Sequence, residues 1–187
     1  MNCSVLEVAV VAVLSPQPPK VKLTKAKCPP VGGLLGKRVG LRRDRFWLSW
    51  DWITDEWARL LEADGAEVVI WRAPVGKGDK EMVEGGAEYA EFLKVIDVAV
   101  SGLGNCGSCT LWAIHDAVGA LDTGLPTAAV ASEHFEPLAR MLAAQRGHDD
   151  LRLKIMPYPL EGKPEDEVRQ IARDHYDGLL ETLGATR

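Results

Sequence analysis

Two cysteines, Cys106 and Cys109, are the residues of this chain whose type and spacing best suit chemistry. They form a Cys-x-x-Cys pair in the glycine-rich stretch DVAVSGLGNCGSCTL of residues 97–111. The β-branched run Val98–Val100 predicts a buried parallel strand, and the apolar spacing of Thr110–Leu121 predicts a helix, so the cysteines fall on the turn between them. A helix N-terminus offers unpaired N–H groups and a partial positive charge, which stabilise a thiolate. Of the two, Cys106 is the better candidate nucleophile.

Two other interpretations of the cysteine pair stay open. Glycine-rich turns after parallel strands are common, and a buried cysteine often serves only as a small apolar side chain. A Cys-x-x-Cys pair also supplies half of a tetrahedral zinc site, but such a site needs two further ligands. The remaining cysteines, Cys3 and Cys28, lie in an irregular N-terminal region without a matching pair, which argues against structural zinc.

The composition indicates a soluble globular protein with one domain. The chain has 187 residues, of which 47% are hydrophobic and 26% are charged. Its net charge of −5 and pI near 5.4 lack the basic excess of a nucleic-acid binder. The longest apolar run, Val8–Leu14, is too short to span a bilayer and follows no basic segment, so neither a membrane span nor a signal peptide is expected. We therefore expect a cytoplasmic protein whose four cysteines are mostly reduced thiols.

Residues 1–36 differ from the rest of the chain, because prolines and lysines follow a single apolar segment. They predict an N-terminal arm or linker before one domain of residues 37–187. The apolar segment Val8–Leu14 can add to a sheet as an edge strand, or dock on a partner subunit or on a second copy of the chain. A partly ordered tail is the alternative.

From Lys37 onward the pattern alternates between strand and helix. The expected strands are Arg38–Arg42, Glu67–Trp71, Val98–Val100, Pro126–Ala131 and Leu151–Met156. A helix is expected after each of them, and the last helix begins at Pro164 and runs through Leu180 as one element. Right-handed crossovers between parallel strands leave few arrangements. The expected fold is a doubly wound α/β domain with a five-stranded parallel sheet, like a flavodoxin or Rossmann fold.

In such sheets, ligands bind outside the carboxyl ends of the strands, near the point where the strand order reverses. The residues predicted to contact a substrate there are Arg42, Arg43, Arg72, Asn105, Ser108, Thr110, Glu133 and Tyr158. The arginines can bind a carboxylate or phosphate through two hydrogen bonds, which predicts a small anionic organic substrate. A cluster of solvated charges is the alternative.

His134 is the predicted acid–base partner of the thiol. It follows the fourth expected strand, one crossover from the cysteine turn, and imidazole titrates near neutral pH. A histidine that starts a helix and faces solvent is the alternative. His115 and Asp116 lie one or two turns into the helix after the cysteines. They can orient or deprotonate Cys109, or they form a surface or helix-packing pair.

Several segments resemble one protein family. The segment GLGNCGSCTLWAIHDA of residues 102–117, together with GLPTAAV, SEHFEPLAR and LRLKIMPYPL, resembles the UGSC family of cysteine or selenocysteine proteins. That family is named for a tetrapeptide in which selenocysteine can stand where this chain has Cys106. The likeness covers most of residues 36–183, and the motif is also similar, more distantly, to selenocysteine-containing subunits of glycine-reductase-type enzymes. The resemblance implies that Cys106 is the attacking atom and Cys109 the resolving thiol.

Three hypotheses about function follow. The first is a thiol-dependent enzyme of the reductase type, or its catalytic subunit, in which Cys106 attacks the substrate and Cys109 resolves the adduct. An external thiol or reductase then resets the disulfide. The second is a metalloenzyme of the hydratase, lyase or hydrolase type, with a transition metal held by Cys106, Cys109 and His134. The third is a non-catalytic partner subunit of a hetero-oligomer, whose arm clamps a second protein and whose cysteines sense redox state.

Overall fold

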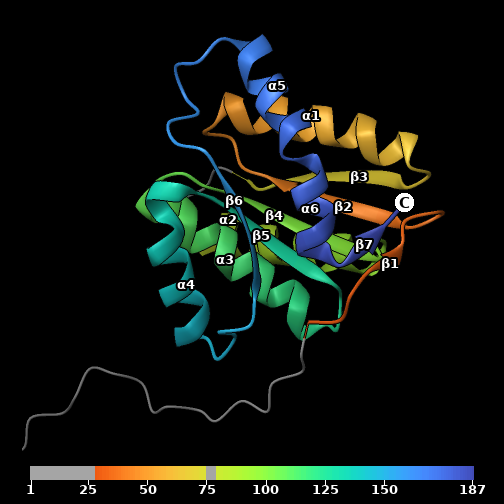
Figure 1. Ribbon diagram of the computed structural model, residues 1–187. Coiled ribbons are helices and arrows are strands. Elements are labelled where there is room, and N and C mark those ends of the chain that lie inside the picture. Colours follow the sequence, from red (N-terminus) through yellow and green to blue (C-terminus); the bar gives the residue numbers. More distant parts are fainter. Residues whose placement is uncertain (1–27, 75–78) are drawn as a thin grey trace, which may run out of the picture.

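The protein is built on a parallel β-sheet of five strands (Figure 1). The computed structural model describes residues 28–74 and 79–187, and of residues 79–84 it describes the backbone alone. The strands are β2 (Arg38–Arg43), β3 (Glu67–Arg72), β4 (Val98–Gly104), β5 (Thr127–Ser132) and β6 (Arg152–Met156). Their order in the sheet is β3-β2-β4-β5-β6, and every neighbouring pair is parallel. The predicted α/β fold with a five-stranded parallel sheet is confirmed.

Helices cover both faces of the sheet (Figure 1). One face carries α1 (Leu48–Ala63), α5 (Glu165–Asp174) and α6 (Tyr176–Leu183). The other carries α2 (Asp79–Lys94), α3 (Gly107–Asp122) and α4 (Glu136–Gln145), and a single 3₁₀ turn, η1 (Glu133–Phe135), precedes α4. Both faces of β4 and β5 are therefore covered, which explains why these two strands consist of small and apolar residues that are all buried.

The core beneath α1 is organised by two tryptophans. The rings of Trp50 and Trp57 meet edge to face, with centroids 5.7 Å apart, and both side chains are fully buried. Each indole N–H finds a backbone carbonyl: Trp50 Nε1 donates to Arg42 at 3.1 Å, and Trp57 Nε1 donates to Ala172 at 2.8 Å. The tryptophans thereby join α1 to the end of β2 and to α5.

The predicted single C-terminal helix is wrong, because the helix breaks at His175 into α5 and α6. The carbonyl of Ala172 would receive the amide of Tyr176 in a continuous helix, and the Trp57 indole donates to it here. The two halves also have different neighbours, since α5 packs on α1 whereas α6 packs on β6. A residue distant in sequence therefore helps to end the helix.

Residues 28–36, the described part of the predicted arm, pack on the domain. Strand β1 (Gly32–Gly33) pairs in parallel with β7 (Ala185–Thr186), and Leu34 is fully buried in the core. The pairing with the chain's last residues was not expected from the sequence. The apolar segment Val8–Leu14 lies outside the described residues. Within the described ranges, no helix is long and apolar enough to cross a membrane.

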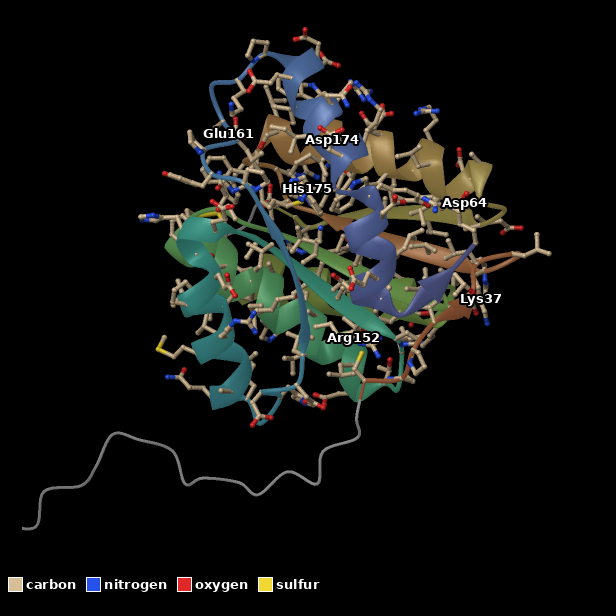
Figure 2. All side chains as sticks on the ribbon, in the orientation of Figure 1. Lys37, Asp64, Arg152, Glu161, Asp174 and His175 are labelled. Atoms are coloured by element: carbon tan, nitrogen blue, oxygen red, sulfur yellow. A yellow bond between two sulfur atoms is a disulfide. The ribbon has the colours of Figure 1, made fainter. Side chains whose placement is uncertain are left out.

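The amino ends of the strands are closed by ion pairs and hydrogen bonds. Asp97 accepts from the amide of Arg38 at 2.9 Å and from its guanidinium. The Arg152 guanidinium donates to the carbonyls of Cys28, Pro29 and Leu183, each at 2.9 Å (Figure 2). The Arg152 contacts hold residues 28–29 and Leu183, close to the two ends of the described chain, at the amino ends of the strands.

Candidate functional site

The strand order reverses between β2 and β4. From β2 the chain moves to β3 on one side, and from β4 it moves to β5 on the other, so the carboxyl ends of these two central strands border the switch point. Open α/β sheets bind their ligands at such a point. The loop after β4, residues 105–106 and here called the cysteine loop, contains Cys106, and Cys109 lies in the first turn of α3 that follows it.

Cys106 is the N-cap of α3, as expected for a residue on the strand-to-helix turn, but the helix begins at Gly107 rather than Thr110, so Cys109 lies within its first turn. The Cys106 Sγ accepts a hydrogen bond from the amide of Cys109 at 3.1 Å. The buried Thr110 hydroxyl donates to the Cys106 carbonyl at 2.6 Å, which gives Thr110 a structural role in the turn. Strand β4, which leads to Cys106, has no room for larger side chains at two positions. A Cβ on Gly102 would stand 2.6 Å from the Trp50 ring, and one on Gly104 would stand 3.1 Å from Ala131.

The two cysteines form a disulfide, with their Cα atoms 5.2 Å apart. Their surroundings differ. Cys109 is only 8% exposed, whereas Cys106 is half-buried and is followed by the exposed residues Gly107 and Ser108. The Ser108 Oγ lies 3.5 Å from the Cys106 Sγ. Cys106 is therefore the cysteine that outside reagents can reach, and Cys109 is the covered one.

The neighbouring strand β5 holds the cysteine loop in place. The Ser132 hydroxyl lies at the end of β5 and donates to the Asn105 side-chain oxygen at 2.8 Å. Asn105 directly precedes Cys106 and is buried. The hydrogen bond joins the ends of β4 and β5 next to the disulfide, so Asn105, predicted as a substrate contact, has a positioning role here.

His134 and Tyr158 lie together at the ends of β5 and β6. Their rings stack with centroids 5.0 Å apart and planes inclined by 23°, and Phe135 packs edge-on against both. Within the described part of the chain, His134 makes no hydrogen bond to either cysteine. Glu133, at the start of η1, is exposed. The acid–base role of His134 stays a prediction.

The three predicted substrate arginines are all paired with carboxylates of the protein itself. The pairs are Arg42–Asp116 at 2.8 Å, Arg43–Asp55 at 2.6 Å and Arg72–Asp51 at 2.9 Å. Arg42 also donates to the carbonyl of Gly102 at 2.9 Å, and Arg72 donates to the carbonyl of Asp44 at 2.7 Å. These contacts remove the observation on which an anionic substrate rested, since each guanidinium already has an anionic partner.

Asp116 is the partner of Arg42, and His115 in turn contacts Asp116. Asp116 is buried and binds Arg42, while the half-exposed His115 places its Nδ1 3.1 Å from the other Asp116 oxygen. The Tyr89 hydroxyl donates to the Asp116 carbonyl at 2.8 Å. Of the two interpretations of His115 and Asp116, these contacts favour the packing pair.

The end of β2 and the loop after it hold three of the four buried side-chain polar atoms that lack a hydrogen-bond partner among the described residues. They are Arg43 Nε, Asp44 Oδ2 and Trp47 Nε1, and the fourth is His148 Nδ1. Burial raises the pKa of Asp44, against the opposing effect of backbone hydrogen bonds from Phe46, Trp47 and Leu103. The Leu103 contact brings this loop against β4, three residues before Cys106.

Asp44 follows the first predicted strand and so belongs to the end of the sheet where a site was expected, but it was not among the residues predicted to contact a substrate. Its side chain is buried and accepts from the amides of Phe46 and Trp47. That burial depends on tertiary contacts, which no local pattern reports.

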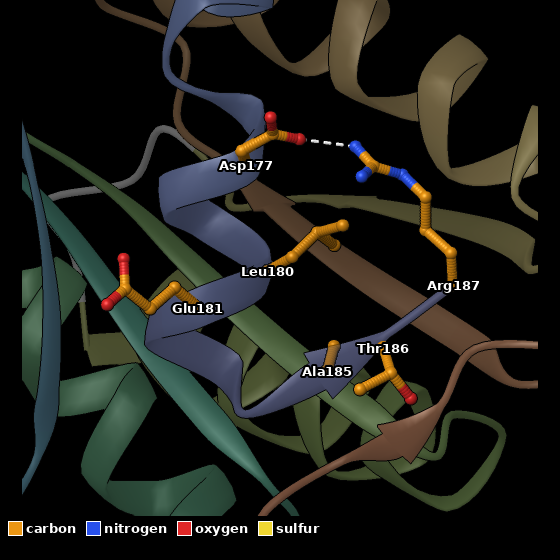
Figure 3. Close-up of a pocket in the computed structure, with 6 residues that line it drawn as sticks. All are labelled: Asp177, Leu180, Glu181, Ala185, Thr186 and Arg187. Atoms are coloured by element: carbon orange, nitrogen blue, oxygen red, sulfur yellow. Dashed lines mark hydrogen bonds and ion pairs between the residues drawn. The ribbon is translucent and has the colours of Figure 1, made fainter.

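A pocket opens at the opposite end of the molecule (Figure 3). It is lined by Asp177, Leu180, Glu181, Ala185, Thr186 and Arg187. Arg187 bridges Asp177 and Asp64, the latter at 3.0 Å. Because β7 pairs with β1 just before the start of β2, this pocket belongs to the amino ends of the strands and contains none of the predicted site residues.

The described residues do not assemble a metal site. Among them, no group of three or more His, Cys, Asp or Glu side chains is arranged to hold an ion. The ligand set Cys106, Cys109 and His134 is therefore not brought together, because the cysteines bond to each other and His134 stacks on Tyr158.

Fold and site together define an α/β protein with a Cys-x-x-Cys disulfide at the start of a helix, beside the switch point of its sheet. A model of the UGSC family matches residues 12–185, so the chain belongs to the UGSC family. The resemblance to that family is confirmed. A search among curated proteins finds no match.

Proposed function

We propose that this protein is a thiol-dependent redox enzyme, or the catalytic subunit of one, that reductively cleaves a small organic substrate. The observation that carries the proposal is the asymmetry of the cysteine pair: Cys106 is accessible at the N-cap of α3, and Cys109 is covered within bonding distance of it. A nucleophile that faces the substrate and a resolving thiol behind it need this arrangement.

The start of α3 supports the reactivity of Cys106. The Cys109 amide donates to the Cys106 sulfur, and the free N–H groups of the first turn add a partial positive charge. Both favour the thiolate over the thiol. We expect the pKa of Cys106 in the reduced protein to lie below the ordinary cysteine value of about 8.5.

In the proposed reaction, the two cysteine thiols supply both electrons that reduce the substrate. The Cys106 thiolate attacks a substrate carbon, an S–C bond forms, and the leaving group departs with its electron pair. The Cys109 thiolate then attacks the Cys106 Sγ, the S–C bond breaks with its electrons on carbon, and a proton from water completes the product. The substrate gains two electrons, which the two thiols supply by becoming a disulfide.

Alkylation of the reduced protein against pH tests the proposal. Iodoacetamide labelling is followed by peptide mass, with Cys109→Ser to observe Cys106 alone and Cys106→Ser to observe Cys109 alone. We expect Cys106 to react at least about tenfold faster than Cys109 at pH 7, with a midpoint below about 8.5. The unfolded protein gives the reference rate for each cysteine.

Two outcomes would contradict the proposal. Equal and slow labelling of both cysteines, as in the unfolded chain, would make the pair structural. Stoichiometric metal in protein purified without chelator, with labelling released only by a chelator, would favour the metalloenzyme hypothesis instead.

A further inference from the structure

Exposed apolar side chains lie at the carboxyl end of the sheet, the end that carries the disulfide. The described residues contain nine large apolar side chains that are exposed, and five of them follow the carboxyl ends of strands. These five, here called the apolar rim, are Phe46, Leu48, Leu111, Trp112 and Tyr158. The other four are scattered over different elements: Leu35, Ile70, Val95 and Met141.

Sequence position and hydrogen bonds relate each part of the apolar rim to the cysteine loop. Leu111 and Trp112 lie within one turn of Cys109 on α3. Phe46 lies four residues past Arg42, whose guanidinium donates to the Gly102 carbonyl of β4 at 2.9 Å. Tyr158 stacks on His134, just past the Ser132–Asn105 hydrogen bond that joins β5 to the cysteine loop. The apolar rim therefore lies at the same end of the parallel sheet as the disulfide, on segments that follow β2, β4 and β6.

We infer that the apolar rim is the docking surface for a folded protein dithiol that reduces the Cys106–Cys109 disulfide. This inference rests on the proposed function, because the proposed cycle ends in that disulfide and needs a reductant. Exposed apolar side chains gathered at one end of a protein mark a contact surface, and a disulfide at that end reacts with thiolates. A small thiol would gain little from such a surface, whereas a protein buries it, and aromatic side chains such as Trp112 and Tyr158 commonly anchor interfaces.

The exchange follows from the exposure of the two sulfurs. A thiolate of the donor attacks the accessible Cys106 Sγ, the S–S bond breaks, and Cys109 leaves as a thiolate in the first turn of α3, where the helix N-terminus stabilises it. The second donor thiolate then attacks the donor's own sulfur in the mixed disulfide and releases the Cys106 thiolate. The donor loses two electrons as a disulfide, and this protein gains them as two thiols.

The test compares two reductants on the oxidised full-length protein. One is a thioredoxin, kept reduced by its reductase and NADPH, and the other is dithiothreitol. The rate is read as the appearance of free Cys106 and Cys109 thiols by alkylation and peptide mass. The rim variant is Leu48→Gln/Trp112→Gln, and the matched control is Met141→Gln, an equally exposed apolar residue on α4 outside the apolar rim.

We expect thioredoxin to reduce the natural protein at least about a hundredfold faster than dithiothreitol at equal concentration, because docking raises the effective concentration of the thiol. The rim variant should lose about tenfold of the thioredoxin rate, keep its dithiothreitol rate within about twofold, and match the control in thermal stability. The control variant should keep both rates.

Three results would overturn the inference. They are a thioredoxin rate no higher than that of dithiothreitol, an equal loss of both rates in the rim variant, and a dimer in sedimentation that the rim variant abolishes. In each case the pH profile of Cys106 alkylation is measured separately. An activated Cys106 with any of these results leaves the proposed function standing and removes only the docking surface.

Discussion

The two ends of the parallel strands differ in how their side chains are paired. The side of the sheet with the amino ends is here called the amino edge, and the side with the carboxyl ends is called the carboxyl edge. At the amino edge, Asp97, Arg152 and Arg187 bind backbone groups and carboxylates that hold the chain ends in place. At the carboxyl edge, the loop after β2 leaves buried polar atoms without partners, the disulfide is accessible at Cys106, and apolar side chains face solvent. Satisfied contacts favour stability, and unsatisfied ones favour interaction with something outside the chain. The amino edge therefore holds the chain ends in place, and the carboxyl edge carries the disulfide and the loop with unpartnered polar atoms.

The pKa values of two aspartates, Asp97 and Asp44, reflect the difference between the two edges. Backbone and side-chain hydrogen bonds from Arg38 lower the pKa of Asp97 at the amino edge. Burial raises the pKa of Asp44 at the carboxyl edge. The same side chain is thus stabilised as an anion at one edge and destabilised as an anion at the other.

The largest expected change in stability comes from an exception to this contrast, the buried Arg42–Asp116 ion pair near the carboxyl ends of the strands. Arg42→Met leaves the buried Asp116 without its guanidinium partner, with only the exposed His115 beside it, and we expect a loss of about 3–5 kcal/mol of unfolding free energy in urea. Arg72→Met is the matched control: its guanidinium is about a third exposed, and we expect a loss below about 1 kcal/mol. A stable Arg42→Met protein would contradict the structural role assigned to Arg42.

The second prediction tests the amino edge. Asp97→Asn removes a carboxylate whose pKa is lowered, so the variant should lose about 1 kcal/mol at pH 7 after allowance for its partial exposure. A carboxyl group whose pKa is lowered on folding stabilises the folded state at pH values above its ordinary pKa. This stabilisation is lost as the pH falls and the carboxylate becomes protonated. The deficit should therefore shrink below about pH 3.9 in urea unfolding curves. A deficit that is constant with pH would argue against this origin.

The smallest expected effect has the opposite sign. Asp44→Asn keeps an oxygen for the amides of Phe46 and Trp47 but removes a carboxylate whose pKa is raised. A raised pKa penalises the folded state once the group ionises, so the variant should gain on the order of 0.5 kcal/mol at pH 7 and nothing below about pH 3.9. If Asp44→Asn and Asp97→Asn shifted stability in the same direction at pH 7, the two edges would not differ as described.

The sequence by itself determined the fold class and the place of the cysteines. Alternating strand and helix patterns are local signals, and so is the glycine-rich turn that ends β4 and starts α3. The place of Cys106 on the strand-to-helix turn and the five parallel strands followed from those signals without knowledge of any long-range contact, whereas the start of α3 at Gly107 did not.

Only the tertiary structure decided which of these residues are free to act. Arg42 meets Asp116 from 74 positions away, so no local pattern could show that the arginine is already paired. Trp57 reaches Ala172 across 115 positions and helps to end α5, and Ser132 reaches Asn105 across 27 and holds the cysteine loop. The burial of Cys109 and Asp44 likewise depends on which elements fold over them. Local patterns determine the elements, whereas pairing and burial depend on contacts between residues that the chain keeps far apart until it folds.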